Sequence, residues 1–260
     1  MPPPIGLIPA AGRATRLGLE KGSKEIVPVA SETGSRPVIE ILLDAMGWAG
    51  IDNTYVVLRD TKWDVPATLL HRQREAWPQL AYLMTPGTGS IPETVDVAHP
   101  FVRDADVVLG FPDVWFRPRP ALAGLLAARA RADHDVVLAL FPSERPDKTD
   151  MVEVEGALVT GLRTKPGPCD LTHTWILATW GPRFTSFLHG YLDASSTHEA
   201  DEAPLELQMS HVFEAALTRG ISIGAHFVHD GHFIDIGTPD DMARASEIRT
   251  SEPLAKGDFA

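Results

Sequence analysis

The chain has 260 residues, of which 44% are hydrophobic and 22% charged, and its formal net charge is −12. This acidic balance argues against a nucleic-acid or anionic-membrane surface, since such partners need a basic face, and it indicates a small-molecule partner. Cys169 is the only cysteine, so no intramolecular disulfide can form. No apolar run approaches the ~18 residues of a membrane span, and no basic leader segment is seen. We therefore expect a cytoplasmic chain.

Short β-rich runs alternate with helical patterns through the first half, which predicts βαβ units and a parallel sheet. Residues 37–49 form the clearest helix, because apolar residues recur at helical spacing between Pro37 and Gly50. The other elements expected in this half are strands at residues 5–9, 54–58, 80–84, 107–109 and 135–141, and helices at 92–101 and 120–131.

The second half changes character, because strand-like segments follow one another with only turns between them. This pattern predicts a mixed sheet or a substrate-covering region. We therefore expect an α/β fold with a doubly wound, mostly parallel, Rossmann-like mixed sheet. The elements expected here are strands at 151–154, 158–162, 174–180 and 221–228, and helices at 182–192, 205–219 and from Pro239, capped by Thr238.

The first strand leads into a loop of small residues that also carries positive charge. Small side chains let backbone N–H groups approach phosphate oxygens, while guanidinium and ammonium groups supply charge beside them. The loop matches neither GxxxxGK[ST] nor GxGxxG. Taken alone, it also fits an ordinary turn with solvated arginines. The small residues are Ala10, Ala11, Gly12, Ala14 and Gly18, and the cationic ones are Arg13, Arg16 and Lys24.

Two aspartates are the best candidates for acidic chemistry. Asp113, in VVLGFPDVWF, follows the carboxyl end of a buried strand, where ligands collect in open α/β sheets. Asp235 stands between Ile234 and Ile236, so we expect it to be buried and to need a partner such as a metal ion. The alternatives are an Asx turn at Asp113 and a hydrogen-bond acceptor beside a helix at Asp235.

Together these segments resemble the sugar nucleotidyltransferases. That family carries AAGxGTRLxP, then PKxxxPV, then LGD or a longer GxPD, and finally DxGTPxD. The resemblance extends over about residues 5–245 and implies the nucleotide-diphospho-sugar transferase type of fold. It also implies that a sugar 1-phosphate attacks the α-phosphorus of a nucleoside triphosphate and releases pyrophosphate. The matching segments are AAGRATRL at 10–17, SKEIVPV at 23–29, GFPD at 110–113 and DIGTPDD at 235–241.

The resemblance also implies roles for individual residues. Mg²⁺ would be held by Asp113 and Asp235, and Arg16 and Lys24 would be the catalytic cations. Thr85 stands where many members have a glutamine that contacts the base, so dTTP or UTP with glucose 1-phosphate are only default substrates. The nucleotide-binding residues implied are Ala10, Ala11, Gly12, Arg13, Ala14, Thr15, Thr85 and Gly89, and the sugar-phosphate-binding residues are Lys165, Thr174 and Glu206.

On this interpretation residues 1–250 form a single domain, with a nucleotide-binding part to about residue 115 and a sugar-phosphate-binding part beyond it. Residues 251–260 would be a poorly ordered tail. Two other functions remain open: nucleotidyl transfer to a non-sugar phosphate, and a non-catalytic regulatory protein that binds a nucleotide sugar. A homo-oligomer is also compatible with the sequence.

Overall fold

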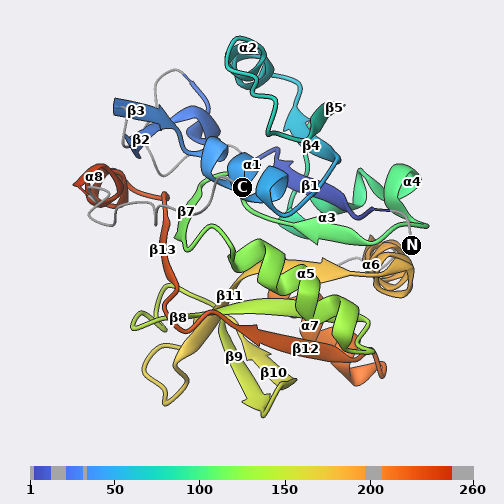
Figure 1. The fold of residues 1–260 in the computed structure, drawn as a ribbon. Helices are drawn as coiled ribbons and strands as arrows, with labels where there is room; N and C mark the ends of the chain where they lie inside the picture. The colour runs from blue at the N-terminus through green and yellow to red at the C-terminus, as the bar shows by residue number, and fades with distance from the viewer. Residues whose placement is uncertain (1–2, 13–21, 32–33, 197–206, 248–260) are drawn as a thin grey trace.

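A nine-stranded sheet runs through the part of the chain that the structure describes (Figure 1). The structure is a computed structural model that describes residues 3–12, 22–31, 34–196 and 207–247. In order across the sheet the strands are β5 (Gln79–Thr85), β4 (Asn53–Arg59), β1 (Ile5–Ala10), β6 (Val107–Leu109), β11 (His173–Trp180), β8 (Val136–Pro142), β12 (Ile223–Phe227), β10 (Leu158–Arg163) and β9 (Met151–Glu155).

The sheet is parallel in its first half and mixed in its second. β5, β4, β1 and β6 pair in parallel, as the alternating pattern predicted. β11 is antiparallel to both β6 and β8, whereas β8 and β12 are parallel to each other. β10 and β9 continue the sheet as antiparallel strands, and β9 also pairs with β11, so this end of the sheet curls back on itself. The predicted α/β class with a mixed sheet is confirmed.

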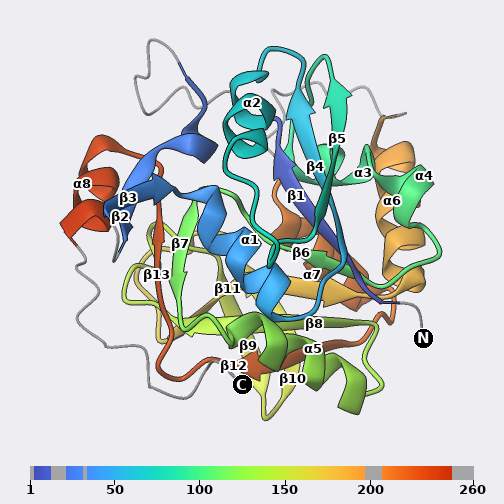
Figure 2. The same cartoon turned by 45° about the horizontal axis from the view of Figure 1, so that its top comes forward.

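Successive strand residues point to opposite sides of the sheet, so both faces carry apolar side chains and both are covered by helices. Ile8 enters one apolar core with residues of α1 and α5, whereas Leu7 enters a second core with residues of α3, α4, α6 and α7. Figure 2 shows α1 and α5 in front of the strands and α7 behind them. The helices are α1 (Ile39–Trp48), α2 (Asp64–Leu70), α3 (Ile91–Asp96), α4 (His99–Val102), α5 (Ala121–Arg131), α6 (Pro182–Ser196), α7 (Met209–Thr218) and α8 (Pro239–Glu247).

Two predicted helices differ from the structure. The helix expected at 92–101 is divided into α3 and α4. Pro100 has no N–H to donate within a continuous helix, and it occupies the first turn of α4, where none is needed. The helix expected at 205–219 begins only at Met209, because Gln208 is extended and caps it; residues 205 and 206 lie outside the described ranges.

Short elements that the sequence pattern did not predict join distant segments. β2 (Pro28–Ser31) and β3 (Gly34–Pro37) form a hairpin, and a 3-10 helix, η2 (Lys24–Ile26), precedes it. β7 (Val114–Arg117) pairs with β13 (His232–Asp235), which lies beside it in Figure 1. α8 follows β13, and its Asp241 N–H donates to Thr238 Oγ1, so the predicted N-cap is confirmed.

Within the described residues, no helix has both the length and the apolar character that crossing a membrane requires.

Candidate functional site

The candidate site lies where the parallel strands of the first half end. The register pairs Ala10 of β1 with Leu58 of β4, and Arg59 of β4 with Thr85 of β5. β6 runs beside β1 in the same direction. The segments that follow these four strands therefore meet at one edge, and ligands of open α/β sheets bind at this edge.

The small-residue loop begins at this edge. Ala10 and Ala11 are buried, whereas Gly12 is exposed and a Cβ built on it would meet no atom of the described residues within 4 Å. The loop residues Arg13, Ala14, Thr15 and Arg16 lie outside the described residues, so their roles stay predictions.

Lys24 is brought to the edge by η2. The Ser23 backbone N–H and hydroxyl donate to the two carboxylate oxygens of Asp64, at 2.8 and 2.7 Å, which fixes the start of this short helix. Lys24 Nζ then forms an ion pair with Asp113 Oδ2. The sequence interpretation assigned Lys24 and Asp113 to one site, and the structure brings them into contact.

The charge on Lys24 is set by its neighbours. Burial lowers the pKa of the ammonium, but nearby carboxylates, Asp113 foremost, outweigh it and hold the pKa above the ordinary value of lysine. Glu25 and Asp235 add to this attraction. Lys24 is therefore a fixed positive charge at neutral pH, placed beside two of the predicted acidic groups.

Asp235 reaches the site through the β7–β13 ladder. Asp235 is paired with Val114, the residue after Asp113, and the Ile236 N–H donates to the Asp113 carbonyl oxygen at 2.9 Å. The expectation that Asp235 is buried is wrong: alternation along the strand buries Ile234 on one face and leaves Asp235 exposed. Asp235 is therefore exposed at this end of the ladder, within electrostatic reach of Lys24.

The two aspartates suit a magnesium ion. Mg²⁺ prefers oxygen ligands, and it is commonly held by one or two protein carboxylates together with substrate phosphates and water. Asp235 is paired with the residue after Asp113, and both carboxylates act on the charge of Lys24, so they supply two such groups in one place. Within the described ranges, no set of three or more His, Cys, Asp or Glu side chains could hold a metal ion alone. Substrate phosphates and water would supply the remaining ligands of an ion held by these two carboxylates.

A second ion pair, which the sequence did not reveal, contacts the backbone at the start of the small-residue loop. Lys62 Nζ donates to Glu25 Oε1 at 2.6 Å and to the Ala10 carbonyl oxygen at 2.8 Å, and both side chains are buried. Burial raises the pKa of Glu25, while Lys62 opposes the shift. Since Glu25 follows Lys24 directly, this pair anchors both the small-residue loop and the helix that carries Lys24.

Arg59 links the loop to the segment after β5. Its Nε donates to the Ala11 carbonyl oxygen at 3.0 Å and its NH1 group to the Pro86 carbonyl oxygen at 3.1 Å. Gly87 makes room for the guanidinium, because a Cβ there would lie 2.0 Å from the Arg59 nitrogen. Arg59 is the last residue of β4 and Lys62 follows it closely, so both lie at the carboxyl end of a strand, the same kind of position that indicated Asp113.

Of the two predicted base-side residues, Thr85 ends β5 and Gly89 lies in the segment that follows it. Thr85 is buried, and its hydroxyl accepts the Gly87 N–H at 3.3 Å. The Gly89 N–H donates to the carboxylate of Glu93 at 2.7 Å, and Glu93 also belongs to the cap of α3 at Ser90. Both residues thus order this loop. Contact with a base stays a prediction for both.

The predicted sugar-phosphate residues are less closely gathered. Lys165 is exposed and has a positive φ of 43°, which is unusual for a residue other than glycine. Thr174 is buried, and its hydroxyl donates to the Asp150 carbonyl oxygen at 2.7 Å. Glu206 lies outside the described residues. In the described part of the chain, no hydrogen bond or ion pair joins Lys165 or Thr174 to the Lys24–Asp113 pair.

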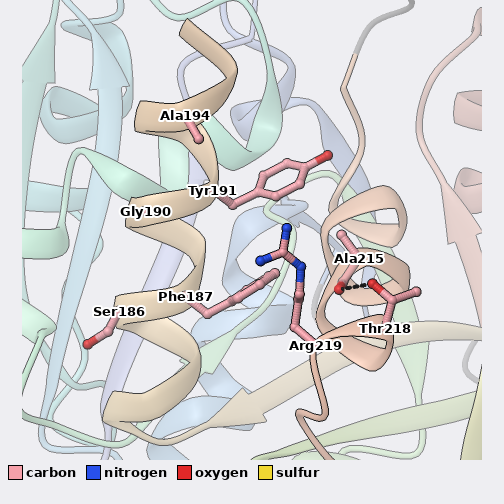
Figure 3. Close-up of a pocket in the computed structure, with 8 residues that line it drawn as sticks. All are labelled: Ser186, Phe187, Gly190, Tyr191, Ala194, Ala215, Thr218 and Arg219. Atoms are coloured by element: carbon pink, nitrogen blue, oxygen red, sulfur yellow. Dashed lines mark hydrogen bonds between the residues drawn. The ribbon is translucent and has the colours of Figure 1, made fainter. Parts of the chain in front are cut away.

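A separate hollow of about 350 Å³ lies between α6 and α7 (Figure 3). The Arg219 side chain extends between the rings of Phe187 and Tyr191, and the Thr218 hydroxyl donates to the Ala215 carbonyl oxygen at 2.7 Å. The segments that line this hollow carry none of the predicted site residues. It is therefore distinct from the candidate site.

Known structures share this architecture over nearly the whole chain. A Bacillus anthracis protein described as a glucose-1-phosphate thymidylyltransferase has a TM-score of 0.79 at 15% identity, covering 96% of this chain and 97% of that one. The UTP-bound UGPase of Acinetobacter baumannii has a TM-score of 0.73 at 17% identity, covering 94% and 92%. The inositol-1-phosphate CTP transferase of T. maritima has a TM-score of 0.72 at 14% identity, covering 94% and 97%.

The chain has the nucleotide-diphospho-sugar transferase fold. The resemblance inferred from the motifs is thereby confirmed at the level of the fold, with sugar nucleotidyltransferases among its structural neighbours. No protein-family model matches the sequence. One curated relative, a 2-C-methyl-D-erythritol 4-phosphate cytidylyltransferase of Nocardia farcinica, is 28% identical over 157 residues. That match spans 60% of this chain and 63% of the relative, which is less than two thirds of its length.

Proposed function

We propose that this protein is a nucleotidyltransferase that joins a nucleoside monophosphate unit to a phosphorylated small molecule, with a sugar 1-phosphate as the first choice of acceptor. The observation that carries the proposal is the Lys24–Asp113 ion pair, with Asp235 beside it, at the strand edge where the small-residue loop begins. Structural similarity to transferases that act on UTP, CTP and sugar phosphates supports the same reaction class.

In the proposed reaction an oxygen of the acceptor phosphate attacks the α-phosphorus of the triphosphate. The bond from the α-phosphorus to the oxygen that bridges to the β-phosphorus breaks, and pyrophosphate leaves with that bond's electron pair. Such a displacement depends on positioning and on neutralising negative charge. No covalent intermediate on the protein is required.

Different residues of the site would position the substrates and neutralise their charge. The Lys24 ammonium would lie between the α-phosphate and the acceptor phosphate, and the ion pair with Asp113 keeps it oriented and charged. Backbone N–H groups of the loop after Ala11 would bind the remaining phosphate oxygens, assisted by Arg16. Asp113 and Asp235 would hold Mg²⁺, which when bound supplies charge neutralisation on the triphosphate.

A phosphorylated alcohol is the second candidate acceptor, with CTP as the donor. The curated relative is named for 2-C-methyl-D-erythritol 4-phosphate, and a structural neighbour is named for inositol 1-phosphate. Both names describe cytidylyl transfer to a polyol phosphate. Because Thr85 differs from the glutamine of many thymidylyl and uridylyl transferases, CTP belongs in the test beside dTTP and UTP.

The test is pyrophosphate release from a matrix of nucleotides and acceptors in the presence of Mg²⁺. The nucleotides are dTTP, UTP, CTP, ATP and GTP, and the acceptors are glucose 1-phosphate, other sugar 1-phosphates, inositol 1-phosphate and 2-C-methyl-D-erythritol 4-phosphate. The proposal predicts that one pair gives turnover well above the Asp113→Asn variant. Absence of turnover for every pair, with calorimetric binding of a nucleotide sugar that needs no metal, would instead identify a regulatory binding protein.

A further inference from the structure

A buried polar network lies at the start of β9 and includes one of the predicted sugar-phosphate residues, Thr174. The Trp175 indole N–H donates to Ser210 Oγ at 2.8 Å, and the Ser210 hydroxyl donates to Asp150 Oδ2 at 2.5 Å. Thr174 binds the backbone carbonyl of the same aspartate. Ser210 lies in the first turn of α7, where the helix dipole favours a negative charge. One oxygen of the Asp150 carboxylate is therefore bound within the network.

The other carboxylate oxygen of Asp150 takes no part in this network. Asp150 Oδ1 is covered from solvent and has no hydrogen-bond partner in the part of the chain that the structure describes. A buried carboxylate oxygen without a donor costs free energy, and native structures rarely tolerate one without a reason. Holding Ser210 and Trp175 in place would need only one acceptor, which an asparagine could provide. The second oxygen thus has no role within the described network.

The network lies at the same edge as Lys24 and Asp113. β11 runs antiparallel to β6, with Ala178 opposite Leu109, so the residues before Ala178 extend beyond the carboxyl end of β6. Thr174 is paired with Met151, which places Asp150 beside this extension. The Trp175 ring lies 5.4 Å from the ring of Phe111, centroid to centroid.

Phe111 begins the short segment that ends at Asp113, so the network contacts the loop that carries the Lys24 partner. Asp150 itself is only partly buried, and the side-chain χ2 of aspartate turns over a broad range. A modest rotation can therefore expose the unpaired oxygen while the carboxylate stays near Ser210.

We propose that Asp150 determines acceptor specificity by accepting a hydrogen bond from a hydroxyl or ammonium group of the phosphorylated acceptor. This inference rests on the proposed nucleotidyl transfer and adds to it a contact in the second half of the chain. A carboxylate can only accept, so it selects an acceptor with a donor group at the matching position. An acceptor that lacks this group leaves Asp150 unpaired and is rejected.

The decisive variant is Asp150→Asn, which keeps the shape but replaces one oxygen by a donor. With glucose 1-phosphate, or inositol 1-phosphate if that acceptor is turned over instead, we expect the KM for the acceptor to rise ~10- to 100-fold, the range of one charge-assisted hydrogen bond. The KM for the nucleotide should change less than about twofold. Asp147→Asn is the matched control, because Asp147 is exposed and three residues away.

Monodeoxy analogues of the same acceptor separate a direct contact from a structural role. The wild-type protein should lose activity on one analogue by the factor that Asp150→Asn causes, and the variant should lose nothing further on that analogue. An unchanged acceptor KM, or an equal loss on every analogue, would overturn the inference. Wild-type turnover reports on the proposed function separately, since its absence refutes the reaction before any variant is compared.

A measurement on the wild-type protein covers the case in which Asp150→Asn does not fold. The indole N–H resonance of Trp175, assigned with Trp175→Phe, should shift when glucose 1-phosphate or inositol 1-phosphate is added together with the nucleotide. The shift should shrink for the one analogue that lacks the critical donor. If the chemical shift of the Trp175 indole N–H does not change on addition of an acceptor that is turned over, a contact at Asp150 is contradicted.

Discussion

Replacing Lys62 by methionine tests how the small-residue loop is supported. The Lys62 side chain is 8% exposed and that of Glu25 0%. The substitution removes the donor to Glu25 at 2.6 Å and to the Ala10 carbonyl at 2.8 Å while keeping most of the volume. The loss of two charge-assisted hydrogen bonds, with one carboxylate left buried and unpaired, should lower the free energy of unfolding by about 3–5 kcal/mol near pH 7.

The loss should depend on pH in a definite direction. Burial raises the pKa of Glu25, and without Lys62 that pKa rises further. Between the unfolded and folded pKa values the folded chain keeps a proton that the unfolded chain has released, so stability falls as pH rises, by up to about 1.4 kcal/mol per pH unit. The deficit of the Lys62→Met variant should therefore be larger near pH 8 than near pH 5.

Urea unfolding followed by tryptophan fluorescence measures both effects. Adding Glu25→Gln to Lys62→Met should restore part of the lost stability, because it removes the unpaired charge. Lys148→Met is the control, since Lys148 is exposed, and it should change the free energy of unfolding by less than about 0.5 kcal/mol. A loss below about 1 kcal/mol at pH 8, or a double variant less stable than Lys62→Met, would refute the reasoning.

Three further outcomes follow from packing and charge. Gly47→Ala should destabilise the fold by about 1–3 kcal/mol in thermal unfolding, because the added Cβ would lie 1.7 Å from the Ala76 carbonyl oxygen. Alanine normally favours a helix over glycine, so an increased Tm would contradict this packing. Phe213→Ala should cost about 3–5 kcal/mol by the same measurement, since this ring is fully buried between two aromatic neighbours. Hydrogen bonding to Asp96 raises the pKa of His189, so NMR titration of Asp96→Asn should show it returning toward the ordinary value. The stability that this pair adds should be present at acidic pH and vanish as pH rises through the folded pKa of His189.

Local patterns in the sequence predicted the elements whose signals are local. Alternating strands and helices located β1, β4, β5 and β6, and therefore the edge to which Asp113 belongs. β7 and β13 were not predicted, because each has four residues and pairs with a segment more than a hundred positions away. Asp235 was identified from its motif, but its exposure depends on that ladder and could not be read locally.

Buried charges were the other feature that the sequence concealed. Lys62 and Glu25 are separated by 37 positions, and in the sequence each has the character of an ordinary solvated residue. Only the fold shows that they form an ion pair and that Lys62 also binds the Ala10 carbonyl oxygen. Asp150 is a similar case, since its partner Ser210 lies 60 positions away on another helix. The residues that support the site are thus the ones defined by tertiary contacts.

The rate of pyrophosphate release tests the central claim most directly. With the best nucleotide and acceptor pair, wild-type protein should turn over in Mg²⁺, and Asp113→Asn and Lys24→Gln should each lose at least about a hundredfold in kcat/KM. Asp104→Asn, at a position 90% exposed and outside the site, should stay within about twofold of wild type. Full activity of Asp113→Asn, or no pyrophosphate from any pair, would contradict a nucleotidyl transfer site built on Lys24 and Asp113.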